Sequence, residues 1–226
     1  LSIRRQRQMC IRDRVSTTRI FLEKVTREAE LHMLQEELPR AVQLIKTVVP
    51  DVIVFGCTSA GSLGGLAHDA RIAQFIEQES GGKALTVLAA VLAQLALIRP
   101  QKVAVFTPYQ EELTRSVAEC VAEAGYRMVK TAGMGILDNR EIGELTPGEI
   151  VNFIESHMHG IDTDCLFLSC TNWQAIAAIE PLQTKFGLRV ISSNQATIDA
   201  VRRLAAAKSA QAEQGPLAGS NIPIAR

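Results

Sequence analysis

Two stretches of the chain share one pattern: residues 51–59 read DVIVFGCTS and residues 164–172 read DCLFLSCTN. In each, an aspartate opens a short apolar run that is typical of a buried strand, and a Cys-Thr pair follows at the same spacing. A second match pairs TVLAAV, which begins at Thr86, with TIDAVR, which begins at Thr197. The two matches lie at nearly the same offset, so they indicate a duplicated half-domain with one Cys-Thr pair in each half.

Strands and helices alternate around these stretches. Apolar, β-branched runs predict strands at 51–55, 103–107, 127–132, 165–169 and 189–192. Helical spacing and capping residues predict helices at 23–48 with a break at Pro39, and at 84–98, 109–124, 146–158, 173–186 and 195–206. Such alternation predicts an α/β fold with parallel sheets between helices. We expect two pseudosymmetric lobes, the first from residues 15–100 with 190–207 and the second from 101–189.

The two ends of the chain differ from this pattern. Residues 1–14 hold five arginines and one aspartate without strand or helix periodicity, and we interpret them as a non-native or disordered leader. Ala, Gln, Gly, Ser and Pro dominate from Ala205 onward, so we expect residues 208–226 to form a disordered tail. By the symmetry of the repeat, the first copy requires a strand that would precede residue 1. We therefore expect a fragment that lacks its first strand.

Composition excludes several classes of protein. The formal net charge is zero, which argues against a nucleic-acid partner, because such proteins carry a basic excess. The longest apolar stretch, residues 84–98, is shorter than the about 20 residues that span a bilayer, so we expect no membrane partner. Five cysteines without a CxxC pair do not suggest a disulfide framework. Reduced thiols and a cytoplasmic location are expected instead.

Cys57 and Cys170 are the candidate catalytic residues. Each follows a strand and precedes a helix, at the sheet edge where ligands bind in open α/β sheets. The helix dipole and free backbone amides there would lower a thiol pKa, and the same amides could hold carboxylates together with Thr58, Ser59, Thr171 and Asn172. Burial for packing alone is the competing interpretation of the two cysteines.

Other candidate residues fit structural roles at least as well. Cys120 and Cys165 fall inside a helix and a strand, so we expect both in the core. Ser192, Ser193 and Asn194 reach the same sheet edge as the two cysteines but could equally cap the last helix. His157 and His159 have poor spacing for a metal and no evident third ligand, so no metal site is predicted.

Five motifs carry a family resemblance: FGCTSAGSLGG (55–65), FTPY (106–109), GILDNREIGELTPGEI (135–150), LSCTNW (168–173) and VISSNQAT (190–197). As a set they resemble the aspartate/glutamate racemase superfamily, and within it the maleate cis-trans isomerase and arylmalonate decarboxylase branch. The resemblance covers about residues 15–207. It departs at the start, because nothing in residues 1–14 resembles the Asn-containing carboxylate loop of the family's first strand.

The resemblance implies roles for single residues. By position, Cys57 matches the cysteine that adds to the alkene in maleate isomerases, and Cys170 matches the cysteine that handles the proton. Tyr109 and Asn139 match ligands of the substrate carboxylates. The decarboxylases of this branch keep only the second cysteine, so a chain with both is more similar to an isomerase or a racemase. The family also implies closure of two lobes over the substrate and no metal or organic cofactor. We expect a homo-oligomer such as a dimer.

The sequence thus predicts a cofactor-independent two-cysteine isomerase that acts on a small dicarboxylate, as in the conversion of maleate to fumarate. An aspartate/glutamate-type amino-acid racemase would use the same thiols as paired acid and base, but it would need an acidic group for the amine, and the sequence does not locate one. An arylmalonate-type decarboxylase is a further alternative. A protein that only binds small anions is the non-enzymatic alternative.

Overall fold

The computed structural model describes residues 14–213, with the backbone alone for residues 208–213. Its strands are all paired in parallel and form two sheets, one of two strands in the order β1-β2 and one of four in the order β4-β3-β5-β6. The strands are β1 (Val52–Phe55), β2 (Lys83–Thr86), β3 (Lys102–Thr107), β4 (Arg127–Gly133), β5 (Cys165–Leu168) and β6 (Arg189–Ser192). The predicted α/β class with parallel sheets is confirmed.

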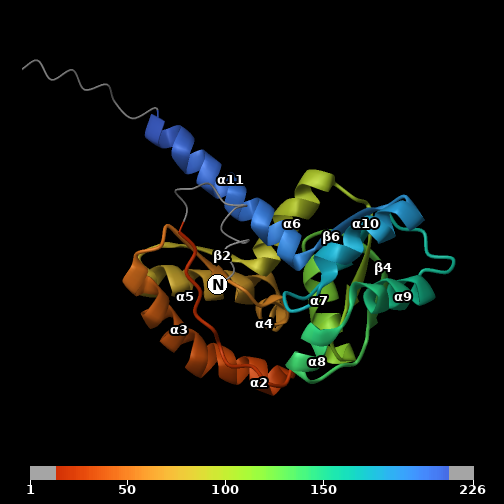
Figure 1. Ribbon diagram of the computed structural model, residues 1–226, viewed down its shortest axis with the longest axis horizontal. Coiled ribbons are helices and arrows are strands. Elements are labelled where there is room, and N and C mark those ends of the chain that lie inside the picture. The colour runs from red at the N-terminus through yellow and green to blue at the C-terminus, as the bar shows by residue number, and fades with distance from the viewer. Residues whose placement is uncertain (1–13, 214–226) are drawn as a thin grey trace, which may run out of the picture.

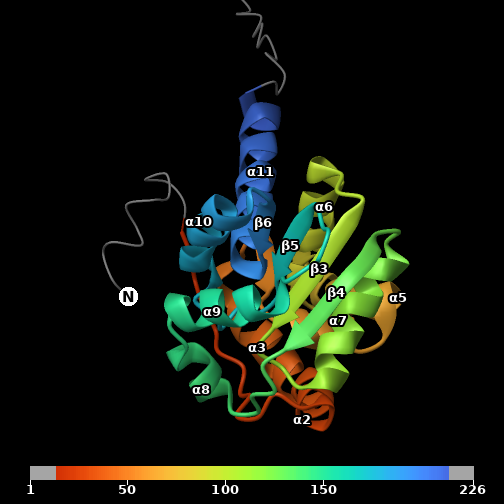
Figure 2. The same cartoon turned by 90° about the vertical axis from the view of Figure 1, so that its right-hand side faces the viewer.

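A helix follows each of these strands, and the helices cover the sheets (Figures 1 and 2). In chain order they are α2 (Arg27–His32), η1 (Met33–Glu37), α3 (Leu38–Ile45), η2 (Lys46–Val48), α4 (Thr58–Ser62), α5 (Gly65–Ser80), α6 (Val87–Ile98), α7 (Glu111–Glu123), α8 (Asn139–Glu144), α9 (Pro147–His157), α10 (Ala175–Phe186) and α11 (Ser193–Glu213). Within residues 14–213, no helix combines the length and apolarity that crossing a membrane requires.

The internal repeat is present in the fold, although only one of its two sequence matches is in register. β1 and β5 occupy corresponding positions, because each pairs in parallel with the strand that follows it across one helical connection, β2 or β6. The last residues of β2 and β6 are Thr86 and Ser192, whereas the second sequence match pairs Thr86 with Thr197, which lies inside α11. That second match therefore has no structural equivalent.

Three predicted boundaries are wrong. Residues 84–86, expected to begin a helix, instead form β2 together with Lys83, because Phe55 and its neighbours in β1 offer a parallel partner. Residues 190–192, assigned to the first lobe, belong to β6 and hydrogen-bond to β5 in the four-stranded sheet. The helix expected to end near residue 206 continues to Glu213 and projects from the body of the molecule (Figure 1), so the expected tail is partly helical. Residues 1–13 and 214–226, where the leader and the rest of the tail fall, lie outside the described residues.

Pro39 does not break the first helical segment. It lies in the first turn of α3, where its missing N–H costs least. The preceding turn, η1, is a π-helix in which the amide of Leu38 bonds to the carbonyl of Met33. Widening one turn in this way absorbs the proline while the chain stays helical.

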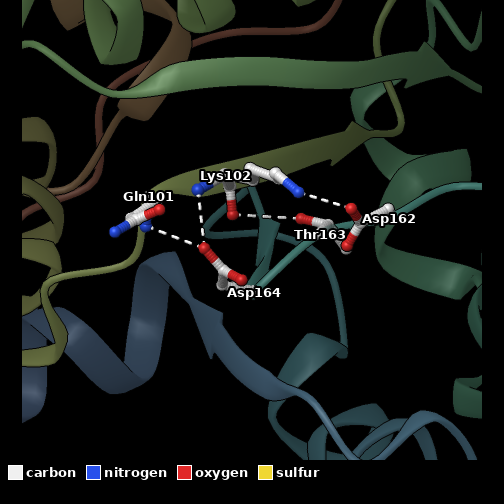
Figure 3. A network of polar contacts seen from close by, with 5 residues as sticks. All are labelled: Gln101, Lys102, Asp162, Thr163 and Asp164. Atoms are coloured by element: carbon white, nitrogen blue, oxygen red, sulfur yellow. Dashed lines mark hydrogen bonds and ion pairs between the residues drawn. The ribbon is translucent and has the colours of Figure 1, made fainter.

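A polar network at the start of the central strands fixes the four-stranded sheet (Figure 3). One oxygen of Asp164 accepts the backbone amides of Gln101 and Lys102, both at 2.8 Å. Thr163 donates to the carbonyl of Lys102 at 3.1 Å, and the Lys102 ammonium pairs with Asp162. The aspartate that opens the second repeat therefore has a structural role at the edge opposite Cys170, and it holds β3 and β5 in register.

Candidate active site

Cys57 lies at the carboxyl end of β1 and is the N-cap residue of α4. The hydroxyl of Ser59 lies 3.7 Å from its sulfur. The side chain is partly exposed. Cys57 thus lies between the end of a strand and the start of a helix, as expected.

Cys170 follows β5 and is 4% exposed. Its sulfur accepts the backbone amides of Asn172 and Trp173 and forms a hydrogen bond with the side chain of Tyr109. Tyr109 comes just after β3, the neighbour of β5, and is itself buried. Parallel pairing of β3 with β5 therefore brings the FTPY motif to the second cysteine.

The two cysteines share one site. They lie close enough that negative charge on Cys170 raises the pKa of Cys57, and charge on either sulfur raises the pKa of Tyr109. The expectation that the helix dipole would lower both thiol pKa values is wrong. Desolvation raises the pKa of Cys170 to about 11 despite its three hydrogen-bond donors, and it raises the pKa of Cys57 further. Burial thus favours the neutral thiol form of both side chains.

Glu30 is the group that the sequence analysis missed. It lies on α2, its side chain is fully buried, and one of its oxygens, Oε1, accepts the hydroxyl of Ser59. The Cys57 thiol donates to the same oxygen at 4.0 Å. Burial raises the pKa of Glu30 to about 7. The available signal was a carboxylate on the apolar stripe of an amphipathic helix, three residues before the buried Met33.

Side chains near the cysteines form hydrogen bonds that join the segments following the two sheets' strands. The hydroxyls of Thr58 and Ser193 lie 2.9 Å apart, and both residues are fully buried. Thr171 donates to the carbonyl of Gly56 at 2.8 Å, and Asn194 donates to the carbonyl of Thr171 at 2.9 Å. Ser192 accepts the amide of Gln195 as a helix cap. The segment 192–194 therefore has both of the roles considered for it: it caps α11, and it also reaches the sheet edge near the cysteines.

Asn139 and Asn172 contact each other. The amide of Asn172 donates to the carbonyl of Asn139 at 2.6 Å and to its side-chain oxygen at 3.1 Å, while the Asn139 amide donates to the carbonyl of Leu22 at 2.9 Å. Both ends of the Asn139 side chain are therefore occupied by protein groups. A hollow of about 490 Å³ lies beside them, lined in part by Thr171, Asn172 and Asn194.

The remaining cysteines and histidines have structural surroundings. Cys120 and Cys165 are buried in the core, as predicted. His157 hydrogen-bonds the carbonyl of Phe153 and packs on its ring. Among the described residues, no group of three or more His, Cys, Asp or Glu side chains could hold a metal ion.

A family model described as arylmalonate decarboxylase matches residues 14–218. The chain belongs to the arylmalonate decarboxylase family. The maleate isomerase of Geobacillus stearothermophilus is 25% identical over 188 residues, which are 80% of this chain and 74% of that protein. The maleate isomerase of Nocardia farcinica is 26% identical over 183 residues, 78% of this chain and 72% of that protein.

Solved structures of the family have the same fold. A mutant of arylmalonate decarboxylase in a liganded form superposes with a TM-score of 0.76 at 23% identity, over 81% of this chain and 78% of that one. A Nocardia farcinica maleate cis-trans isomerase mutant with a covalently bound succinylcysteine intermediate gives a TM-score of 0.75 at 23% identity, over 82% and 78%. The resemblance expected from the motifs is confirmed. So is the expectation of an enzyme, since these relatives are isomerases and a decarboxylase.

Proposed function

We propose that this chain is a cofactor-independent isomerase that converts a small cis-dicarboxylate, with maleate as the first candidate, into its trans isomer. The observation that carries the proposal is the pair of thiols, Cys57 and Cys170, held at corresponding strand ends of the repeat within one electrostatically coupled site. The maleate isomerase relatives and the covalent succinylcysteine of one of them support this chemistry.

In the proposed reaction the sulfur of Cys57 adds to one alkene carbon. A C–S bond forms, the π bond breaks, and its electron pair moves onto the neighbouring carbon and carboxylate. Cys170 gives a proton to that carbon, which leaves a single bond free to rotate. Return of the proton to Cys170 and loss of the Cys57 sulfur then release the trans product.

The surrounding groups bind the substrate and stabilise the charge that develops on it. The backbone amides that follow each cysteine, those of Thr58, Ser59 and Thr171, would receive the two carboxylates. Tyr109 already bonds Cys170 and would help place its proton. Asn139 and Asn172 are hydrogen-bonded to each other, so their proposed role as carboxylate ligands requires them to exchange that contact for the substrate.

We place the enzyme in the cytoplasm, where its thiols stay reduced, and expect it to act as a dimer.

An amino-acid racemase is the second candidate. Glu30 is a buried carboxyl beside both thiols, which is the acidic group that an amine-bearing substrate would need. A decarboxylase is less favoured, because Cys57 would have no role in it.

Proton NMR in deuterated buffer separates these activities in one experiment. Incubation of the protein with maleate should produce the olefinic signal of fumarate. Exchange of the α-proton of D-aspartate, or loss of CO2 from an arylmalonate, in place of that signal would contradict the isomerase proposal.

Adduct formation tests the two cysteine roles. With maleate, intact-protein mass spectrometry should detect an adduct on the Cys170→Ser variant, which can add sulfur but cannot complete proton transfer. The Cys57→Ser variant should form none. An adduct mapped to Cys120 or Cys165 would contradict the assignment.

A further inference from the structure

Glu30 has no role in the reaction described so far, yet it contacts the attacking thiol. Its Oε1 accepts both the Ser59 hydroxyl and, at 4.0 Å, the Cys57 thiol, and Ser59 lies 3.7 Å from the Cys57 sulfur. The three side chains form a closed triangle between α2 and the start of α4. The second oxygen, Oε2, is buried and has no hydrogen-bond partner among the described residues.

Burial of such a carboxyl group is energetically unfavourable. A desolvated carboxylate with an unpaired oxygen costs several kcal/mol unless a cation or further donors compensate. Arg27, a cation that acts on Glu30, donates to the carbonyl of Leu63 and lies 3.9 Å from Glu112, so its attraction to Glu30 only partly offsets the burial. Glu30 also interacts with Cys57, Cys170 and Tyr109, because a negative charge on Glu30 raises the pKa of each of them.

We propose that Glu30 is the base that takes the thiol proton of Cys57 as its sulfur attacks, and that Ser59 positions the carboxyl for this transfer. This inference rests on the proposed role of Cys57 as the nucleophile. The S–H bond breaks, its electron pair stays on sulfur to form the C–S bond, and the proton moves to Glu30. When the Cys57 sulfur leaves at the end of the reaction, the same proton returns to it, so Glu30 is restored in each turnover.

The geometry favours a base over a binding group for an ammonium. The thiol already donates to Oε1, and Ser59, which orients the carboxyl, belongs to the same turn as Cys57. A pKa of about 7 lets Glu30 both accept and release a proton near neutral pH, as a general base must. A group that holds an ammonium should instead stay ionised.

The experiment measures alkylation of Cys57 by iodoacetamide in the full chain, followed by peptide mapping from pH 5.5 to 9.5. In the unaltered chain, the rate should rise with an inflection near pH 7 and then level off, because it follows ionisation of Glu30. Glu30→Gln should lose the inflection and react at least about 100-fold more slowly at pH 7. Glu30→Asp keeps a carboxylate and should retain the inflection at an intermediate rate.

A matched control is Glu28→Gln, which removes an exposed carboxylate from the same helix and should leave the pH profile unchanged. The alternatives give different results. If Glu30 only suppresses the thiolate through its charge, Glu30→Gln will speed up alkylation, and the proposal is wrong. If Glu30 binds an ammonium, Glu30→Gln will leave alkylation intact and abolish proton exchange of D-aspartate, which also overturns it.

Alkylation does not require maleate to be a substrate. A profile that depends on Glu30 in a chain that does not isomerise maleate would support the base and refute only the proposed function. If the chain isomerises maleate but Glu30→Gln leaves the alkylation profile unchanged, the proposed function is supported and the assignment of Glu30 as the base is wrong.

Discussion

At the scale of one residue, Asp69, which lies outside the active site, shows how burial shifts the pKa of a carboxyl group. It lies on α5, is 5% exposed, and accepts the hydroxyl of Thr86, which is also the N-cap of α6. Its other oxygen has no partner among the described residues, and Gly61 packs so closely that an added Cβ would lie 2.5 Å from it. Desolvation outweighs the hydrogen bond and raises the pKa of Asp69 to about 6.

This shift predicts a pH-dependent stability. The folded chain binds the Asp69 proton more tightly than the unfolded chain does, so the stabilisation is complete below about pH 4 and is lost as pH rises through 6. Asp69→Asn cannot titrate. Between pH 4 and 7, its free energy of unfolding should therefore gain about 2 kcal/mol relative to the unaltered chain, as measured by urea denaturation.

Glu119→Gln, which removes an exposed carboxylate of α7, is the control for this comparison. Stability curves of Asp69→Asn and the unaltered chain that run parallel over this pH range would contradict the prediction.

At the scale of an element, α9 begins with a cap made entirely of neighbouring residues. Thr146 accepts the amide of Glu149, and Glu149 accepts the amide of Thr146 at 2.8 Å, which together make a capping box with Pro147 in the first turn. Local sequence is sufficient here because every partner lies within one helical turn.

Removing the cap should destabilise the protein by a measurable amount. Thr146→Ala leaves amides at the start of α9 without a side-chain acceptor, and should lower the free energy of unfolding by about 1 kcal/mol. Thr146→Ser keeps the acceptor and should stay close to the unaltered chain in urea denaturation. An equal loss in both variants would show that the methyl group, not the cap, is responsible.

At the scale of the whole molecule, buried hydroxyls join the two sheets next to the active site. Thr58 follows β1 in the first sheet, and Ser193 follows β6 in the second, so their hydrogen bond spans 135 positions of sequence. Because both side chains are fully buried, a hydroxyl that loses its partner cannot be hydrated without opening the contact.

A double-mutant cycle measures this contact. Thr58→Val and Ser193→Ala should each cost about 1–3 kcal/mol of unfolding free energy, because each leaves the other hydroxyl unpaired. The double variant should cost less than the sum by at least about 1 kcal/mol. Thr58→Val combined with Ser156→Ala on the exposed face of α9 should be additive. Additivity in the first pair would show that the hydroxyls are not coupled.

The sequence by itself determined the features that depend on neighbouring residues. The apolar runs of β1 and β5, each ending in Cys-Thr, placed Cys57 and Cys170 at strand ends, because strand and turn preferences act over a few residues. The same local signals gave the bounds of β3, β6, α9 and the end of α10 closely. The parallel α/β class followed from their alternation.

Only the tertiary structure decided the strand pairings, the partners of the site residues and the ionisation of the site. β6 joined the second sheet because β5 offered an open edge, and Asn139 met Asn172 because α8 packs against the Cys170 loop. Glu30 reached Cys57 from 27 positions away in sequence. Desolvation depends on every segment that packs around a group, and no local pattern records that, so burial reversed the expected thiol pKa shifts.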